Sequence, residues 1–85
     1  MHVKQFEGKN GTVKNQFIIE DGTKTIFQSY KSIIAIKEGG KVTLDESTWD
    51  YSTTTGKYRN QFLGEDKATT EKKIKQGVYK LANLN

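Results

Sequence analysis

The sequence predicts an α+β domain: a twisted antiparallel sheet of four or five strands with one main helix packed on it, a short second helix and a C-terminal strand. In the first half of the chain, short runs rich in Val, Ile and Phe alternate with glycine-containing turns, as in hairpins. Aromatic residues at helical spacing then lie between a helix start signal and a stop signal in residues 51–64. Because 85 residues are enough for one core, residues 1–85 are expected to form a single domain.

The sheet is predicted to begin with two hairpins. Residues 3–6 alternate apolar and polar side chains, and a turn signal at residues 9–11 follows them. The pair Asp21 and Gly22 is the strongest short hairpin signal in the chain. It predicts that residues 16–28 form two paired strands.

A second pair of strands is predicted after a polar break. Residues 32–37 are rich in β-branched side chains and too few for a helix, so they indicate a central strand. Gly39 and Gly40 supply a turn into residues 41–44, an expected outer strand with one face in water. The break at residues 29–32 is interpreted as a crossover or a contact loop, of which the crossover is the commoner outcome.

The main helix is predicted to start at Thr53, because Ser52 is a good N-cap residue. Tyr58 and Phe62 lie four residues apart on one face of this helix, and Gly64 suits a left-handed C-terminal cap. Two interpretations of its first turn remain open. Its hydroxyls either hold a phosphate or carboxylate ligand, or they satisfy the helix's own backbone, which is the commoner situation.

A second, shorter helix is predicted within residues 65–75. Thr69 or Thr70 is the expected N-cap, and Gly77 is expected to end the helix. Residues 78–81 then indicate a last strand that closes the sheet.

Composition excludes several kinds of chemistry. The sequence has no cysteine, so disulfides, thiolate zinc sites and cysteine nucleophiles are excluded, and no cofactor is expected. The only histidine, His2, lies beside the N-terminus, where a positioned base or metal ligand is not expected. Without an apolar run of membrane-spanning length or a signal-peptide core, no membrane partner is expected and the protein is predicted to be cytoplasmic.

The acidic side chains are interpreted as solvated surface charges, because their spacing shows no pair of carboxylates converging in a cleft. They are Asp45, Glu46, Asp50, Glu65 and Asp66. A small enzyme is therefore only the third hypothesis for function, and the protein is predicted to be non-enzymatic.

The formal charge of +4 favours weak, salt-sensitive attraction to polyanions. Basic side chains from both predicted helices and the last strand are the candidate contacts for a macromolecule. They are Lys57, Arg59, Lys72, Lys73, Lys75 and Lys80. A single arginine suits the reading of DNA sequence poorly, and the helix dipole alone explains lysines near the end of the second helix.

Several ordered segments resemble a family of small uncharacterised proteins from bacterial phages and mobile elements. They are Gln28-Ser29-Tyr30, Ile33-Ile34-Ala35, Val42-Thr43-Leu44, Trp49-Asp50-Tyr51-Ser52, Thr54-Thr55-Gly56-Lys57-Tyr58, Phe62-Leu63 and Leu84-Asn85. The resemblance runs from Phe27 to the end of the chain and centres on the D-Y-S-x-T-T-x-K pattern. It implies a phage or mobile-element origin and no catalytic or ligand-binding role for these positions.

Two functions are therefore carried forward. The first is a non-enzymatic accessory protein that binds a host or phage protein, as counter-defence inhibitors such as anti-CRISPR proteins do. The alternative is a nucleic-acid-binding regulatory or architectural protein that uses the lysine-rich side. Self-association as a homodimer is a further expectation, through the strand at residues 41–44 or the C-terminal strand.

Overall fold

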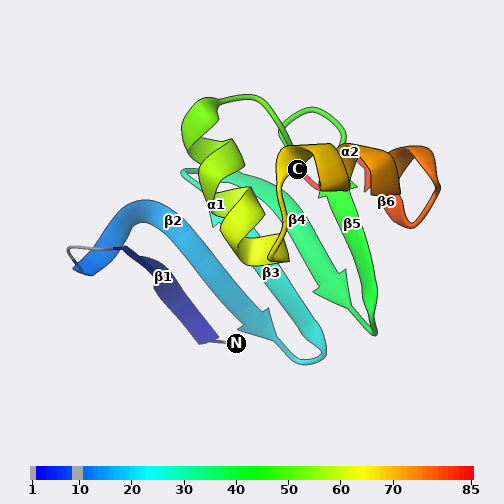
Figure 1. The fold of residues 1–85 in the computed structure, drawn as a ribbon. Coiled ribbons are helices and arrows are strands. Elements are labelled where there is room, and N and C mark those ends of the chain that lie inside the picture. Colours follow the sequence, from blue (N-terminus) through cyan, green and yellow to red (C-terminus); the bar gives the residue numbers. More distant parts are fainter. Residues whose placement is uncertain (1, 9–10) are drawn as a thin grey trace.

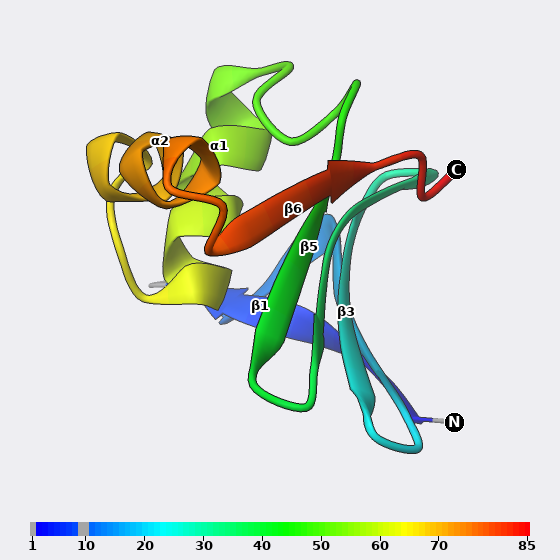
Figure 2. The ribbon, with the colours of Figure 1, turned by 90° about the vertical axis from the view of Figure 1, so that its right-hand side faces the viewer.

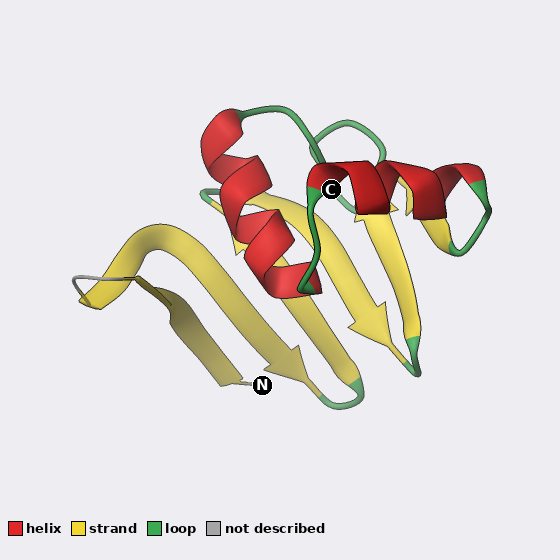
Figure 3. Cartoon of the chain, in the orientation of Figure 1, coloured by secondary structure: helices red, strands yellow, loops and turns green. Residues whose placement is uncertain are grey.

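Six strands and two helices make up the part of the chain that the computed structural model describes, residues 2–8 and 11–85 (Figure 1). The strands are β1 (His2–Gly8), β2 (Gly11–Asp21), β3 (Lys24–Ser29), β4 (Ser32–Glu38), β5 (Lys41–Asp45) and β6 (Tyr79–Ala82), and the helices are α1 (Thr53–Leu63) and α2 (Lys67–Lys75). All strands belong to one sheet, so the predicted α+β class is confirmed, with more strands than predicted (Figure 3).

The strands lie in the sheet in chain order, from β1 to β6. The first five are joined by hairpins and run antiparallel, whereas β6 runs parallel to β5. The sheet is therefore mixed, and the prediction of a purely antiparallel sheet is wrong. The chain crosses from β5 to β6 through both helices, and a helical crossover of this kind returns a strand in the same direction.

Two strand predictions need correction. Strand β5 lies between β4 and β6, so residues 41–44 do not form an outer strand, and the edges of the sheet are β1 and β6. Tyr30 and Lys31 form a tight turn between β3 and β4 in place of the expected crossover. Tyr30 has a φ of 55°, which lets the chain reverse within two residues. Residues 9 and 10 of the predicted first turn lie outside the described part.

Both helices cover the same side of the sheet, as the view along its edge shows (Figure 2). Side chains from this side of the sheet and from α1 form the core. Phe27 is fully buried at its centre, with its ring centroid 5.2 Å from that of Phe6 and 5.7 Å from that of Phe62. Within the described residues, the other side of the sheet carries no helix.

The ends of α1 are as predicted. The Ser52 hydroxyl accepts a hydrogen bond from the Thr55 N–H at 3.1 Å, and Gly64 adopts the left-handed conformation with a φ of 71°. Helix α2 starts at Lys67, three or four residues earlier than an N-cap at Thr69 or Thr70 would give, so that N-cap prediction is wrong. Its N-cap is Asp66, whose carboxylate accepts from the Thr69 N–H at 2.8 Å, because a carboxylate before the first turn suits the helix dipole.

Candidate functional site

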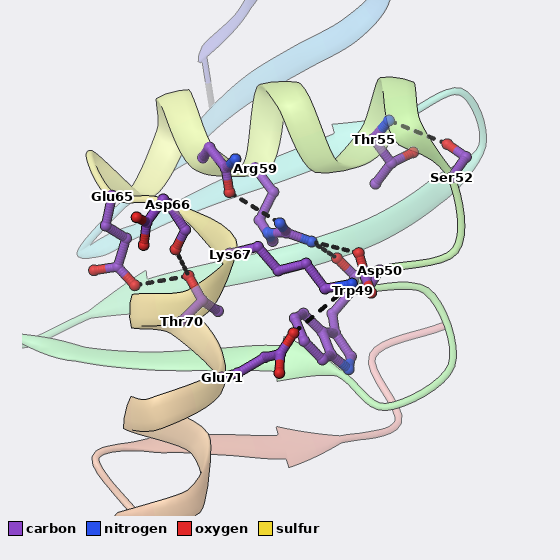
Figure 4. Close-up of polar contacts among 11 residues, drawn as sticks. Trp49, Asp50, Ser52, Thr55, Arg59, Glu65, Asp66, Lys67, Thr70 and Glu71 are labelled. Atoms are coloured by element: carbon purple, nitrogen blue, oxygen red, sulfur yellow. Dashed lines mark hydrogen bonds and ion pairs between the residues drawn. The ribbon is translucent and has the colours of Figure 1, made fainter.

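A buried arginine joins the loop before α1 to the helix itself (Figure 4). The Arg59 side chain is 1% exposed, and one of its terminal nitrogens donates to the Trp49 carbonyl at 2.8 Å and to the Asp50 carboxylate at 3.1 Å. Its other terminal nitrogen donates to the Asn60 amide oxygen at 2.9 Å. The guanidinium fork thus fixes the loop, the carboxylate and the helix relative to one another.

Arg59 reaches this place because α1 presents it on the buried side of the helix, three residues after Gly56 and three before Phe62. Its guanidinium carbon lies 5.2 Å from the centre of the Trp49 ring, at cation–π distance. The charge is therefore paired, hydrogen-bonded and stacked, which are the conditions under which an arginine is buried.

A polar hollow of about 620 Å³ opens beside this network, between the first turns of α1 and α2. Its lining consists of Asp50, Ser52, Thr53, Gly56, Lys57, Arg59, Asn60 and Lys67. Three cations face one carboxylate here, and the exposed start of α1 adds the positive end of a helix dipole. The hollow therefore favours an anionic group.

Lys67 closes one side of the hollow. Its ammonium group lies 2.8 Å from the Asp50 carboxylate and 3.7 Å from that of Glu71. The hydrogen bond from Lys67 lowers the pKa of Asp50 by more than burial raises it, and Arg59 lowers this pKa further. The same contact with Asp50 raises the pKa of Lys67. Both groups are therefore charged at neutral pH.

A second polar network ties the loop between the helices to β6. The Glu65 side chain, 9% exposed, accepts from Lys73 at 2.7 Å, from the Tyr79 hydroxyl at 2.8 Å and from the Thr70 hydroxyl at 2.7 Å. Burial alone would raise the pKa of Glu65, but these three hydrogen bonds outweigh it and hold the pKa below its usual value. The Glu65 carboxylate therefore holds α2 and β6 together.

We expect Glu65→Gln to flatten the acid side of the stability profile. Because the pKa of Glu65 is lower in the folded than in the unfolded protein, its contribution is present above about pH 4.5 and is lost as the pH falls through the folded pKa. Urea midpoints measured from pH 7 to pH 3 should fall less in the variant than in the wild type. The exposed Glu46→Gln serves as the control, and an unchanged slope in Glu65→Gln would contradict this role.

The basic residues predicted as contacts are not gathered on one face. Arg59 is buried, so its assignment as a surface contact is wrong. Lys73 is held by Glu65, and its pKa is raised by that contact. Lys80 follows Tyr79, whose side chain lies in the core, and alternation along the strand places Lys80 on the side of the sheet away from the helices.

The remaining candidates keep exposed positions. Lys72 and Lys75 are exposed on α2, and Lys57 is exposed at the edge of the hollow. Of the six predicted residues, the structure brings only Lys57 and Arg59 together. It adds Lys67, which sequence reasoning missed because its partner Asp50 belongs to a different element.

Two of the five carboxylates are not solvated surface charges, so that prediction is corrected for them. Asp45 is 1% exposed, and the Glu65 side chain is 9% exposed. Glu46, Asp50 and Asp66 are exposed as expected, although Asp50 also pairs with Arg59 and Lys67. The signal for Asp45 was available, since an Asp followed by Ser47 and Thr48 is typical of a side chain that binds the next backbone N–H groups.

Within residues 2–8 and 11–85, no group of three or more potential metal ligands comes together. Neither helix in this part has the length and apolarity that crossing a membrane requires.

Comparison with known proteins gives one match. The model of a family of unknown function, DUF8033, matches residues 1–77. No curated protein and no solved structure matches the chain.

Proposed function

The chain belongs to the DUF8033 family, whose function is unknown, and we propose that it is a non-enzymatic accessory protein that acts by binding a host or phage protein. The observation that carries this proposal is the cationic hollow between α1 and α2. An acidic segment of the partner would bind in this hollow. Inhibition of a host defence system, in the manner of anti-CRISPR proteins and in the host cytoplasm, is the specific role that the family resemblance suggests.

The surroundings of the hollow favour a protein partner. Tyr51, which lies between two lining residues, is 51% exposed, and exposed tyrosines are enriched where proteins contact each other. Lys57 and Lys67 supply the positive charge, and the exposed Thr53 supplies a hydroxyl. A partner carboxylate entering between the two lysines would complete the charge balance of the hollow.

Nucleic acid is the less favoured partner. A duplex or single strand is held by lysines and arginines that follow the phosphate backbone over an extended surface. Among the described residues, the exposed lysines are spread over α1, α2, several strands and the turn between β3 and β4. Such scattered lysines give short contacts, which suit a local acidic segment better than an extended phosphate backbone.

We expect Lys57→Glu to reduce capture of the partner by about tenfold or more, because it places a negative charge at the mouth of the hollow. The measurement is affinity capture from a bacterial host lysate with the tagged protein, read by mass spectrometry with and without nuclease. Lys75→Glu is the matched control, since it makes the same charge change on α2 outside the hollow.

A nuclease-resistant protein that is lost with Lys57→Glu and kept with Lys75→Glu would support the proposal. Recovery that vanishes with nuclease and weakens equally in both variants would overturn it in favour of nucleic acid. Capture of the same protein by both variants would also overturn the assignment of the hollow.

A further inference from the structure

The side of the sheet away from the helices, called here the open face, carries its side chains in rows. One row crosses four neighbouring strands and alternates in charge. It consists of Asp21, Lys24, Glu38 and Lys41, each directly opposite the next in the strand register. All four are exposed, and none takes part in the ion pairs of the described residues.

The next row is apolar. It consists of Val3, Ile19, Ile26 and Ile36, again directly opposite one another on β1 to β4. Val3 is 53% exposed and the three isoleucines are partly exposed. None of the four packs against the core on the helix side. Four aligned aliphatic side chains without a covering layer form an apolar stripe across the sheet.

A further row of mixed character completes the open face. Phe17 and Ile33 lie there beside Gln5 and Gln28, and they too are outside the core. The end of the chain reaches over part of this face. Leu84 lines a shallow hollow of about 200 Å³ together with Ile36 and Thr43. The rest of the apolar row is uncovered.

We propose that the open face binds the open face of a second copy of this chain. The two copies would be related by a two-fold axis that lies between the two sheets, runs parallel to the strands and passes over the gap between β3 and β4. The pairing rests on a different surface from the hollow between α1 and α2, so it stands independently of the proposed function. Because both helices cover the side of the sheet opposite the open face, the helical layers of both copies would lie outside in such a dimer (Figure 2). The hollows between α1 and α2 would then remain accessible.

The charge row identifies the second copy as the occupant. A two-fold axis between β3 and β4 reverses the order of the row in the partner, so Asp21 faces Lys41 and Lys24 faces Glu38. An alternating row with an even number of charges is therefore complementary to its own reverse. A surface of a single sign would repel its copy, and this one attracts it.

The apolar row fits the same axis. Ile26 of one copy faces Ile36 of the other in the centre. Toward the margins, the polar Thr43 of β5 faces Ile19, and Lys80 of β6 faces Val3. Two sheets that pack in this way keep their strands within about 30° of each other and lie about 10 Å apart, as in a β-sandwich. The central isoleucines then form the dry middle of the interface.

The area of the open face is of the order that a stable protein–protein interface needs. With strands about 4.8 Å apart and about 3.3 Å of rise per residue, the face covers roughly 500 Å² of flat area. Protruding side chains make the accessible surface larger than the flat area, and a stable interface takes about 800 Å² from each partner.

The first test is sedimentation equilibrium over a dilution series. We expect wild-type protein to approach twice the mass of the 9.7 kDa chain, and Ile26→Lys to raise the dissociation constant about a hundredfold, because it places a charge in the dry centre. Leu81→Lys is the matched control: Leu81 is 43% exposed and, two residues after the core residue Tyr79 on β6, lies on the helix side of the sheet. Circular dichroism of each variant verifies that it folds.

The second test distinguishes a second copy from any other partner. Lys24→Glu and Glu38→Lys each create like-charge contacts across the axis, so each variant alone should dissociate about tenfold more readily. In an equimolar mixture every contact between the two variants joins opposite charges, and we expect the dimer to return. Mixing cannot repair a defect within one chain, so this recovery reports the contact between copies.

Wild-type protein that remains at 9.7 kDa at every concentration would overturn the proposal. So would a dimer that survives Ile26→Lys or a mixture of charge variants that does not recover. Loss of lysate capture by Lys57→Glu with an intact dimer would leave the two surfaces separate, as proposed. An open face that instead captured a different protein, with no dimer, would overturn the second copy as its occupant.

Discussion

Replacing Arg59 by alanine should lower the free energy of unfolding by about 3 kcal/mol, since it removes a large buried side chain together with hydrogen bonds from a charged group, which contribute about 1.5–3 kcal/mol each. The guanidinium is 1% exposed and makes three hydrogen bonds, to Trp49, Asp50 and Asn60. Its removal leaves the Trp49 carbonyl without its donor and opens a space beside the Trp49 ring. A small domain is stable by only about 5–10 kcal/mol, so this loss is a large fraction of the total.

The measurement is the urea midpoint of Arg59→Ala against that of the wild type at pH 7. Arg59→Lys should also lose stability, because an ammonium group cannot reproduce the fork that reaches three partners. Lys57→Ala, on the exposed surface of the same helix, is the control and should shift the midpoint little. If Arg59→Ala unfolded at the same urea concentration as the control, the structural role given to Arg59 would be wrong.

The same arginine positions the hollow. By holding Asp50 and the start of α1 together, it fixes the carboxylate that Lys67 also contacts. We therefore expect Arg59→Ala, at a temperature at which it is still folded, to capture less partner than the wild type even though its Lys57 is unchanged. Under the proposed function, Arg59 would act on binding through the shape of the site, whereas Lys57 would act by direct contact.

Much of the fold could be predicted because its signals are local. The turn at Asp21 and Gly22 and the caps at Ser52 and Gly64 depend on the conformations that these residues adopt within a few positions of the chain. The first helix could be predicted from its two ends, although its interior of threonines and glycine favours a helix only weakly.

The features that could not be predicted depend on contacts between distant elements. The sequence of residues 79–82 does not predict that this strand pairs parallel with β5. The direction of the strand follows from the path of the chain through both helices. Arginine is a residue type that is mostly exposed. Arg59 is buried because it contacts Trp49 and Asp50, which lie in the loop before α1. Whether the lysines share a face likewise depends on the orientations of the helices and the sheet, which the sequence does not give.

Asp45 is the clearest case of a misread carboxylate, and Asp45→Ala carries the second large effect. One carboxylate oxygen accepts from the Ser47 N–H at 3.0 Å and from the Thr48 N–H and hydroxyl at 2.9 Å each, and the other accepts from the Leu84 N–H at 2.8 Å. The side chain therefore joins the loop before α1 to the end of the chain. Alanine would leave three backbone N–H groups without an acceptor.

We expect Asp45→Ala to lower the free energy of unfolding by about 3 kcal/mol, since each buried donor left unpaired costs about 1–3 kcal/mol. Asp45→Asn keeps one acceptor oxygen and the same shape, so its loss should be smaller. The two urea midpoints at pH 7 give this order directly. Equal stability of the alanine variant and the wild type would show that water satisfies these donors equally well.

The pH dependence of the same variants separates the charge from the shape. Burial by itself raises the pKa of Asp45, but the hydrogen bonds from Leu84, Thr48 and Ser47 outweigh it and hold the pKa below its usual value. The stability that the carboxylate contributes is therefore present above about pH 4 and is lost as the pH falls through the folded pKa. Asp45→Asn has no carboxylate to protonate, so its midpoint should approach that of the wild type as the pH is lowered. A constant difference between the two proteins from pH 7 to pH 3 would show that the amide changes the packing of the loop and that the charge of Asp45 contributes little.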